Sequence, residues 1–147
     1  MDIRELTTED EAKEAVTLVI AAHACQFAWP DQNPDHIPSI GPELIRRGAR
    51  IFAGWADGWR GIMAGMIASD LHSGVLTGFG LMFIVLPGSG AMADALFSRF
   101  ELECRKAGCK RLTLGMLLGA TKSDDNVRKL YSWLGLEPVS ESYSKKL

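Results

Sequence analysis

The sequence predicts a single α/β domain over residues 1–147, with a mixed, mostly antiparallel sheet of six to seven strands flanked by about four helices. Two observations predict this class. Short apolar and β-branched runs alternate along the chain with longer segments whose apolar residues recur at helical spacing. The dipeptide Asp57-Gly58 lies between two such runs and is typical of a two-residue hairpin, which joins antiparallel strands.

The first elements are a short strand at Asp2–Leu6 and a helix from Glu9 to about Cys25. The helix begins at a capping box, Thr8–Glu11, in which a hydroxyl residue is followed three positions later by a carboxylate. The segment Ala28–Pro42 contains four prolines and is expected to be a long loop. A short helix is expected at Glu43–Arg47.

Three strands follow, at Arg50–Ala56, Trp59–Ser69 and Val75–Leu86, the last of them apolar enough to be buried on both faces. Glycines inside the hairpin strands indicate bulges or the close approach of another element. They are Gly54, Gly61 and Gly65.

The C-terminal part alternates helix and strand. A helix ends with Gly108 as its C′ residue, and Lys110–Leu118 is a strand. Ser123 begins a last helix that stops at Gly135, and Glu137–Leu147 supplies a terminal strand or two.

Composition argues against several classes of protein. Hydrophobic residues make up 47% and charged residues 23%, as in soluble globular domains, and the net charge of −2 argues against nucleic-acid binding. The apolar runs at Ala15–Ala22 and Phe79–Leu86 are shorter than the roughly 20 residues that span a bilayer. The charged N-terminus lacks the apolar core of a signal peptide, so we expect a cytoplasmic protein without a membrane partner.

Cys25, Cys104 and Cys109 form no C-x-x-C pair and are expected to be reduced thiols. Because cysteines and histidines are scattered, no metal site is expected.

Between Phe83 and Phe97 the chain passes from an apolar strand through Pro-Gly-Ser-Gly into an alanine-rich helix. The start of a helix carries unpaired N–H groups and a partial positive charge, so it accepts anions. Gly88 and Gly90 allow a ligand to approach the backbone, while Ser89 is a candidate for a helix cap or a phosphate donor. The turn is neither a P-loop nor G-x-G-x-x-G, so a plain corner between packed elements stays open as the alternative.

The order of elements resembles the GNAT N-acetyltransferase superfamily, as do Val85-Leu86-Pro87 and the stretch Leu130–Leu136 (LYSWLGL). In that family a V-x-P strand end is followed by a [QR]-x-x-G-x-[GA] loop, whose amides hold the pyrophosphate of acetyl-CoA. Gly88–Ala93 occupies the loop position here.

This loop departs from the family pattern at two positions. Gly88 stands where Gln or Arg is usual and Ala91 where the middle glycine is usual, while Ala93 fits. A similar Gly-Ser-x-Ala turn occurs in GNAT-like proteins associated with phage genomes.

In the last helix the family pattern is N-x-x-A-x-x-[FL]-Y, which places Asp124 at the Asn and Val127 at the Ala. The resemblance implies acetyl-CoA contacts along the strand end, the turn and this helix. The implied residues are Phe83, Ile84, Val85, Gly88, Ser89, Gly90, Ala91, Met92, Ala93, Asp124, Val127 and Leu130.

The resemblance also implies a chemistry, in which an amine attacks the thioester directly within a ternary complex. A backbone N–H near Phe83–Val85 would stabilise the oxyanion, and Tyr131 would protonate the departing thiolate. The expected acceptor is a small-molecule or peptide amine, and the expected assembly is a monomer or homodimer. A non-catalytic GNAT-like module that binds acyl-CoA, or serves only in structure or interaction, stays open as the alternative.

No general base stands out, because Phe79–Leu86 contains no Asp, Glu or His. The candidate bases are His23, Asp31, Asp35, His36, Asp70 and His72, and ordered water is also compatible. In the family, the long loop with Trp29, Asp31, Asp35 and His36 lies beside the acceptor site. Five basic residues are candidates either for binding the 3′-phosphate of CoA or for a solvated helix face. They are Arg99, Arg105, Lys106, Lys110 and Arg111.

Overall fold

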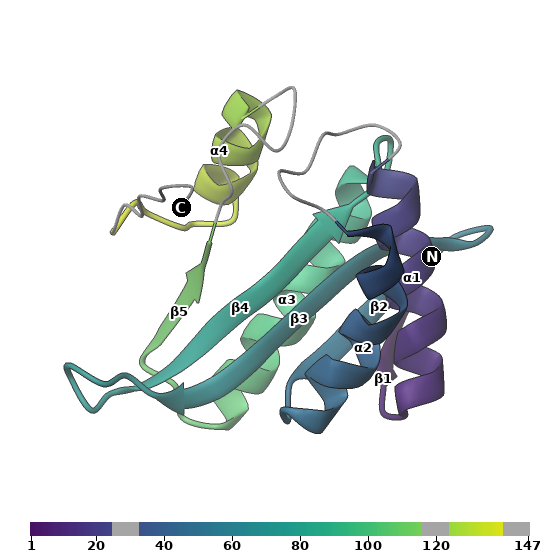
Figure 1. Ribbon diagram of the computed structural model, residues 1–147. Coiled ribbons are helices and arrows are strands. Elements are labelled where there is room, and N and C mark those ends of the chain that lie inside the picture. Colours follow the sequence, from purple (N-terminus) through teal and green to yellow (C-terminus); the bar gives the residue numbers. More distant parts are fainter. Residues whose placement is uncertain (25–32, 116–123, 140–147) are drawn as a thin grey trace, which may run out of the picture.

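The computed structural model describes residues 1–24, 33–115 and 124–139 (Figure 1). The elements in chain order are β1 (Asp2–Leu6), α1 (Glu9–Ala24), the 3-10 helix η1 (Pro34–His36), α2 (Ile37–Arg46), β2 (Arg50–Trp55), β3 (Trp59–Ser69), β4 (Leu76–Val85), α3 (Gly90–Lys106), β5 (Arg111–Leu114) and α4 (Asp124–Trp133).

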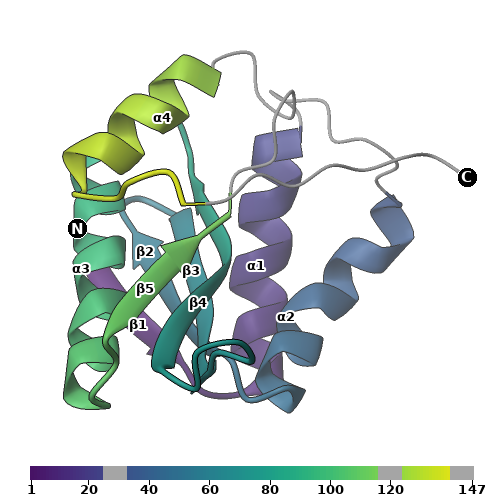
Figure 2. The ribbon, with the colours of Figure 1, turned by 90° about the vertical axis from the view of Figure 1, so that its left-hand side faces the viewer.

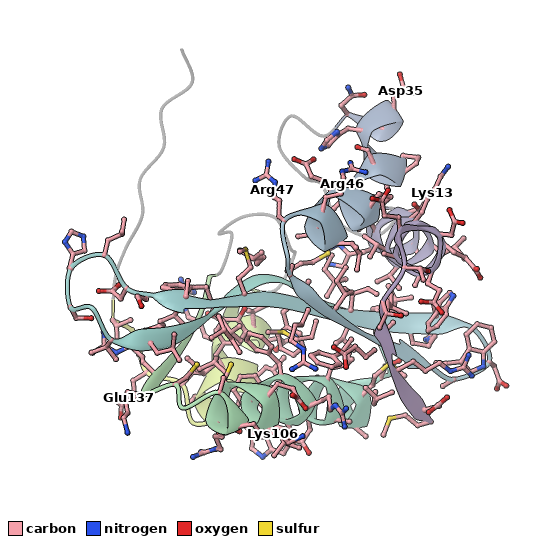
Figure 3. The ribbon with its side chains drawn as sticks, turned by 90° about the horizontal axis from the view of Figure 1, so that it is seen from below. Lys13, Asp35, Arg46, Arg47, Lys106 and Glu137 are labelled. Carbon is pink, nitrogen blue, oxygen red and sulfur yellow. The ribbon has the colours of Figure 1, made fainter. Side chains whose placement is uncertain are left out.

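The strands in these ranges form one sheet in the order β1-β2-β3-β4-β5. Strands β1 to β4 pair antiparallel, whereas β5 runs parallel to β4. Helices α1 and α2 cover one face of the sheet and α3 covers the other (Figures 1 and 2). Figure 3 shows this layering end-on, with Lys13 and Arg46 on one side of the sheet and Lys106 on the other. The predicted mixed, mostly antiparallel α/β architecture is confirmed.

The helix ends follow the predicted signals. At the start of α1, Glu11 N–H donates to Thr8 Oγ1 and Thr8 N–H donates to Glu11 Oε2, both at 3.2 Å, which is the expected capping box. Gly108 and Gly135 have φ values of 84° and 78° and terminate α3 and α4 as C′ residues. In α4 this termination includes a bond of 2.9 Å from Leu136 N–H to the Tyr131 carbonyl.

Helix α3 lies directly on the sheet backbone at four glycines, because every fourth residue of its inner face meets one of them. A Cβ on any of these glycines would overlap or crowd the facing side chain. The pairs are Met92 over Gly54, Leu96 over Gly61, Phe100 over Gly65 and Cys104 over Gly78. We call Gly54, Gly61, Gly65 and Gly78 the glycine row. The close approach expected at the three hairpin glycines is therefore confirmed.

The segment expected to be a loop, Ala28–Pro42, contains helix in its described part. Residues Pro34–His36 form η1, and α2 begins at Ile37, six residues before the predicted Glu43. Pro38 lies in the first turn of α2, where a proline costs no hydrogen bond, while Pro42 lies inside the helix. Apolar residues at helical spacing outweigh the cost of that second proline by packing into the core; they are Ile37, Ile40, Leu44 and Ile45.

Two further expectations need correction. The β2–β3 connection contains three residues, Ala56, Asp57 and Gly58, because Trp55 pairs with Trp59 across a bulge that shifts the register. Asp57 still takes the left-handed conformation, with φ 53°. The described residues form five strands, so the predicted six to seven strands are not confirmed: Glu137–Val139 is irregular, and residues 116–123 and 140–147 lie outside the described ranges.

Candidate active site

The described part of β5 ends beside the middle of β4. Among the described residues the two strands pair from Thr77 with Arg111 to Gly80 with Leu114, and β4 continues to Val85. A bulge lies at the same point on the other edge of β4, where Gly65 pairs with Gly80 and Ala64 pairs with Met82. Leu81 is the extra residue and is 49% exposed, so β4 is not buried on both faces as predicted. The result is an edge of β4 without a strand partner among the described residues.

The backbone groups of Phe83 and Val85 point to this free edge. Leu86 N–H donates to the carbonyl of Arg60, at the start of β3, at 2.9 Å. Hydrogen-bonding groups of successive residues in a strand point to opposite edges, so those of Ile84 also face β3. Those of Phe83 and Val85 therefore face away from β3. The Ile84 side chain is buried against the α1 side of the sheet and contributes no group to this edge.

Tyr131 lies where the two strands part. Its ring stacks on Phe83 with the centroids 6.5 Å apart, and its hydroxyl donates to the Gly115 carbonyl, just after β5, at 2.8 Å. Burial raises the pKa of the Tyr131 phenol above its ordinary value, so this hydroxyl stays protonated and remains a donor. On the same helix, Val127 and Leu130 are half-buried, and Asp124 is the first residue of α4.

The predicted glycine turn leads directly from β4 into α3. Gly88 has φ 78°, a conformation that favours glycine, and Ser89 is the N-cap residue of α3. The N–H groups of Ser89, Gly90 and Ala91 have no acceptor among the residues described. A Cβ on Gly90 would meet nothing within 4 Å, so packing does not require a glycine there. The turn therefore presents three unpaired donors to open space.

The next two amides of the helix are already paired. The N–H groups of Met92 and Ala93 both donate to the Ser89 carbonyl, at 3.0 and 3.3 Å. Both side chains are buried, and Met92 packs on the glycine row. The packing of these two residues holds the turn in place. The unpaired N–H groups belong to the three preceding residues, Ser89, Gly90 and Ala91.

The turn has a contact, from Arg60, that was not predicted from the sequence. Arg60, the second residue of β3, donates from Nη2 to the Pro87 carbonyl at 3.2 Å and from Nε to Ser89 Oγ at 3.4 Å. Ser89 makes no side-chain cap to α3, so its hydroxyl is directed to Arg60. This contact could have been predicted from the antiparallel pairing of β3 with β4, which places the start of β3 beside the end of β4.

Two of the candidate bases lie at the wrong end of the sheet. Asp70 and His72 belong to the β3–β4 connection, where Asp70 Oδ1 accepts from the N–H groups of His72 and Ser73. The ten residues of β4 place this connection about 30 Å from the glycine turn. Figure 1 shows it at the lower end of the sheet, opposite α4. The structure gives both residues a turn-forming role.

Two other candidates lie in η1. Asp35 and His36 are exposed there, and Figure 3 shows Asp35 pointing away from the sheet. His36 Nδ1 lies 3.0 Å from Ser39 Oγ. Trp29 and Asp31 lie outside the described residues, as does Ser123.

His23 is the buried candidate, with 7% of its surface exposed in the last turn of α1. This end of α1 lies at the same end of the fold as α4 (Figure 1). Burial lowers the pKa of the imidazole below its ordinary value of 6.5, which favours the neutral form at pH 7. A neutral imidazole is the form that can accept a proton.

The burial of His23 predicts a pH dependence of stability. Below pH 6.5 the unfolded chain binds a proton at His23 more readily than the folded chain, so the free energy of unfolding should fall as the pH is lowered. Urea unfolding at pH 5.5 and 7.5 measures this loss, which should be smaller in His23→Gln. His72→Gln, an exposed control, should lose as much as the wild type. Equal losses in all three proteins would show that His23 titrates alike in both states.

The basic residues proposed for the 3′-phosphate lie far from the turn. Arg105 and Lys106 end α3, about 24 Å from its start. Each is already paired within the helix, Arg105 with Glu101 and Lys106 with Glu103. Lys110 and Arg111 follow at the start of β5, and Arg99 lies 3.9 Å from Glu103. This arrangement fits the solvated helix face, the alternative left open for this set.

The Cys104 thiol is not activated. Cys104 is buried on the glycine row, and burial with the neighbouring Cys109 raises its pKa to about 12. A thiol in that environment is not ionised at neutral pH. Cys25 lies outside the described ranges.

No group of three or more His, Cys, Asp or Glu side chains that could hold a metal ion occurs in the described parts of the chain. None of the helices there is long and apolar enough to cross a membrane.

No protein-family model and no curated protein matches the sequence, but solved structures match the fold over nearly the whole chain. The aminoglycoside N-acetyltransferase AAC(6')-Iy in complex with CoA is similar with a TM-score of 0.74 at 19% identity, over 99% of this chain and 93% of that chain. A ribosomal-protein-alanine N-acetyltransferase from Brucella melitensis biovar Abortus 2308 is similar with a TM-score of 0.71 at 19% identity, over all of both chains. AAC(6')-IG from Acinetobacter haemolyticus gives 0.73 at 16% identity, over 100% of this chain and 99% of that one.

These similarities confirm the resemblance read from the sequence at the level of fold. The parted strands, the glycine turn and the helix that carries Tyr131 thus lie within an architecture shared with solved N-acetyltransferases. The chain has the GNAT fold.

Proposed function

We propose that the protein is an acetyl-CoA-dependent N-acetyltransferase that transfers the acetyl group directly to a bound amine. The observation that carries the proposal is the free edge of β4, which lies between the helix that bears Tyr131 and the turn that opens α3. A donor edge, a phenol and an anion-accepting turn thus occur at one end of the sheet (Figure 1). Each provides something that acetyl transfer requires.

The turn fits the pyrophosphate of acetyl-CoA. Ser89, Gly90 and Ala91 offer three unpaired N–H groups at the positive end of α3, and Gly90 leaves the approach to them open. Met92 and Ala93 would support this contact through packing, because their amides are occupied. Acetyl-CoA would supply the activated acetyl thioester.

The β4 edge supports stabilisation of the oxyanion. An N–H of Phe83 or Val85 is held rigidly by the pairing of β4 with β3 and points to the side where the strands part. A donor fixed in advance stabilises developing negative charge without reorganising during the reaction. This function depends on the backbone and not on the identity of either side chain.

Tyr131 is the proposed acid for the departing thiolate. Its hydroxyl lies at the parting of the strands and is a donor at neutral pH. The hydroxyl donates to the Gly115 carbonyl, so it is directed at the end of β5. A thiolate bound between β4 and the end of β5 would compete for the same proton. The stacking of the ring on Phe83 fixes its position.

The acceptor is proposed to be a small-molecule or peptide amine. Solved proteins of this fold include enzymes named for aminoglycosides and for ribosomal-protein alanine, so both sizes of acceptor occur on it. His23 is the proposed acceptor of the amine proton, because it is buried at the end of α1 that lies at the same end of the fold as α4 (Figure 1), and its lowered pKa favours the neutral form.

A second candidate function is acyl-CoA binding without transfer. The sequence of β4, LTGFGLMFIV, contains no Asp, Glu or His that could serve as a base at the free edge. This absence favours a binding module, whereas the position of Tyr131 favours the enzyme.

Calorimetric titration with acetyl-CoA tests the proposal, with ATP and NAD as controls. The proposal predicts selective micromolar binding of acetyl-CoA, followed by release of free thiol when a panel of amines is added. Binding without thiol release for any amine supports the second candidate. Failure to bind at millimolar acetyl-CoA rejects both.

Replacing Ala91 by Glu should separate binding from stability. The side chain is exposed beside the free amides, so a carboxylate there would repel the pyrophosphate and weaken acetyl-CoA binding by about tenfold or more. The same carboxylate at the start of a helix should leave the free energy of unfolding unchanged or raise it by about 0.3–1 kcal/mol. Calorimetry and urea unfolding measure the two effects. Ser98→Glu, on the exposed face of α3, adds the same charge and should not affect binding. Equal affinities in both variants would exclude the turn as the pyrophosphate site.

A further inference from the structure

Arg60 is held against the glycine turn by its backbone and by its side chain. Its carbonyl accepts from Leu86 N–H at 2.9 Å, so its Cα is fixed beside the end of β4. Its guanidinium then reaches past that end to the Pro87 carbonyl and to Ser89 Oγ. The half-buried side chain therefore has a defined position at the start of α3.

The charge of Arg60 is not neutralised by the protein there. Arg60 makes no ion pair within the described ranges, and the first turn of α3 contains no acidic residue. The start of a helix is itself positive, and cations are normally disfavoured beside it. A guanidinium fixed next to unpaired N–H groups at such a position is electrostatically unfavourable unless an anion binds between them.

The side chains of Arg60 and Ser89 also retain hydrogen-bond donors that the turn does not use. A guanidinium has five N–H donors, and the turn occupies two of them. Because Ser89 Oγ accepts from Arg60, its own hydroxyl proton is free to donate elsewhere. Arg60 and Ser89 can thus donate to the same anion as the amides of Gly90 and Ala91.

We propose that Arg60 binds the pyrophosphate of CoA, in place of the Gln or Arg side chain that the turn lacks at Gly88. This inference rests on the proposed function. Gly88 has φ 78°, so a residue with a long side chain would be strained at that position. The required cation instead comes from the neighbouring strand β3, across 28 residues of sequence from Gly88. Arginine suits this position because its fork binds phosphate oxygens while still holding the turn.

Calorimetry on Arg60→Gln tests the proposal with two ligands, CoA and 3′-dephospho-CoA. Loss of a charge-assisted contact should weaken the binding of CoA by about 10- to 100-fold. The loss should be the same for 3′-dephospho-CoA, which retains the pyrophosphate. Arg60→Lys keeps the charge without the fork and should recover part of the affinity.

Arg105→Gln is the matched control, because it removes one arginine at the far end of α3. It should bind both ligands as the wild type does. The thermal midpoint of Arg60→Gln should lie within about 2 °C of the wild type, because only a partly exposed contact is lost.

Three results would overturn the proposal. Unchanged CoA affinity in Arg60→Gln would show that the guanidinium only holds the turn. A loss seen with CoA but not with 3′-dephospho-CoA would place Arg60 at the 3′-phosphate. If the wild type itself fails to bind CoA, the proposed function fails and this inference fails with it.

Discussion

Acetyl transfer should slow by about 10²- to 10³-fold when Tyr131 is replaced by Phe, with acetyl-CoA affinity almost unchanged. The substitution removes only the hydroxyl, which donates to Gly115 at 2.8 Å, and leaves the ring on Phe83. The free energy of unfolding should therefore fall by no more than about 1 kcal/mol. Steady-state kinetics and calorimetry measure the two effects, and thermal unfolding checks the fold.

Trp133→Phe is the matched control for this substitution, since Trp133 lies on the same helix but is 67% exposed. It should retain the wild-type rate. If Tyr131→Phe instead loses acetyl-CoA affinity together with thermal stability, Tyr131 is a packing residue and the acid must be another group. A full wild-type rate would likewise assign the thiolate proton to solvent.

Gly65→Ala should destabilise the protein by about 3 kcal/mol, at the upper end of the range for overpacked cores. A Cβ on Gly65 would overlap the ring of Phe100 and lie 2.8 Å from the Phe79 carbonyl oxygen. Phe100 is fully buried, so its ring has no free volume into which it can move. Urea unfolding with a fitted m-value measures the loss.

The cause can be tested by a second substitution in the same pair. Phe100→Leu shortens the facing side chain, so Gly65→Ala should cost less in that background, and a double-mutant cycle gives the coupling. Gly90→Ala adds the same methyl group in open space and should cost nothing. Additive losses in the cycle would show that the glycine row does not act through α3.

Local signals in the sequence predicted local structure well. The Thr8–Glu11 capping box and the glycine ends of α3 and α4 each depend on a few adjacent residues, so they could be predicted directly. The predicted glycine turn also lies where expected, between β4 and α3. Its free N–H groups are those of Ser89, Gly90 and Ala91, because the amides of Met92 and Ala93 pair with the N-cap carbonyl.

Features that depend on distant pairing could not be predicted. Helix α2 forms through two prolines because its apolar side packs against α1 and the sheet, which overrides local preference. The described β4–β5 pairing ends beside the bulge at Leu81, and no composition signal marks that point. Arg60 meets Ser89 only through the antiparallel register of β3 and β4.

The glycine row also restricts where the length of this chain can change during evolution. One residue inserted into α3 after Leu96 would rotate the rest of the helix by about 100°. Arg99 and Glu103 would then take the places of Phe100 and Cys104, which would set charged groups on bare sheet backbone. The Asp70–Gly74 connection has no such constraint, because it projects beyond the sheet (Figure 1). Related chains should therefore differ in length at that connection and keep the length of α3 unchanged.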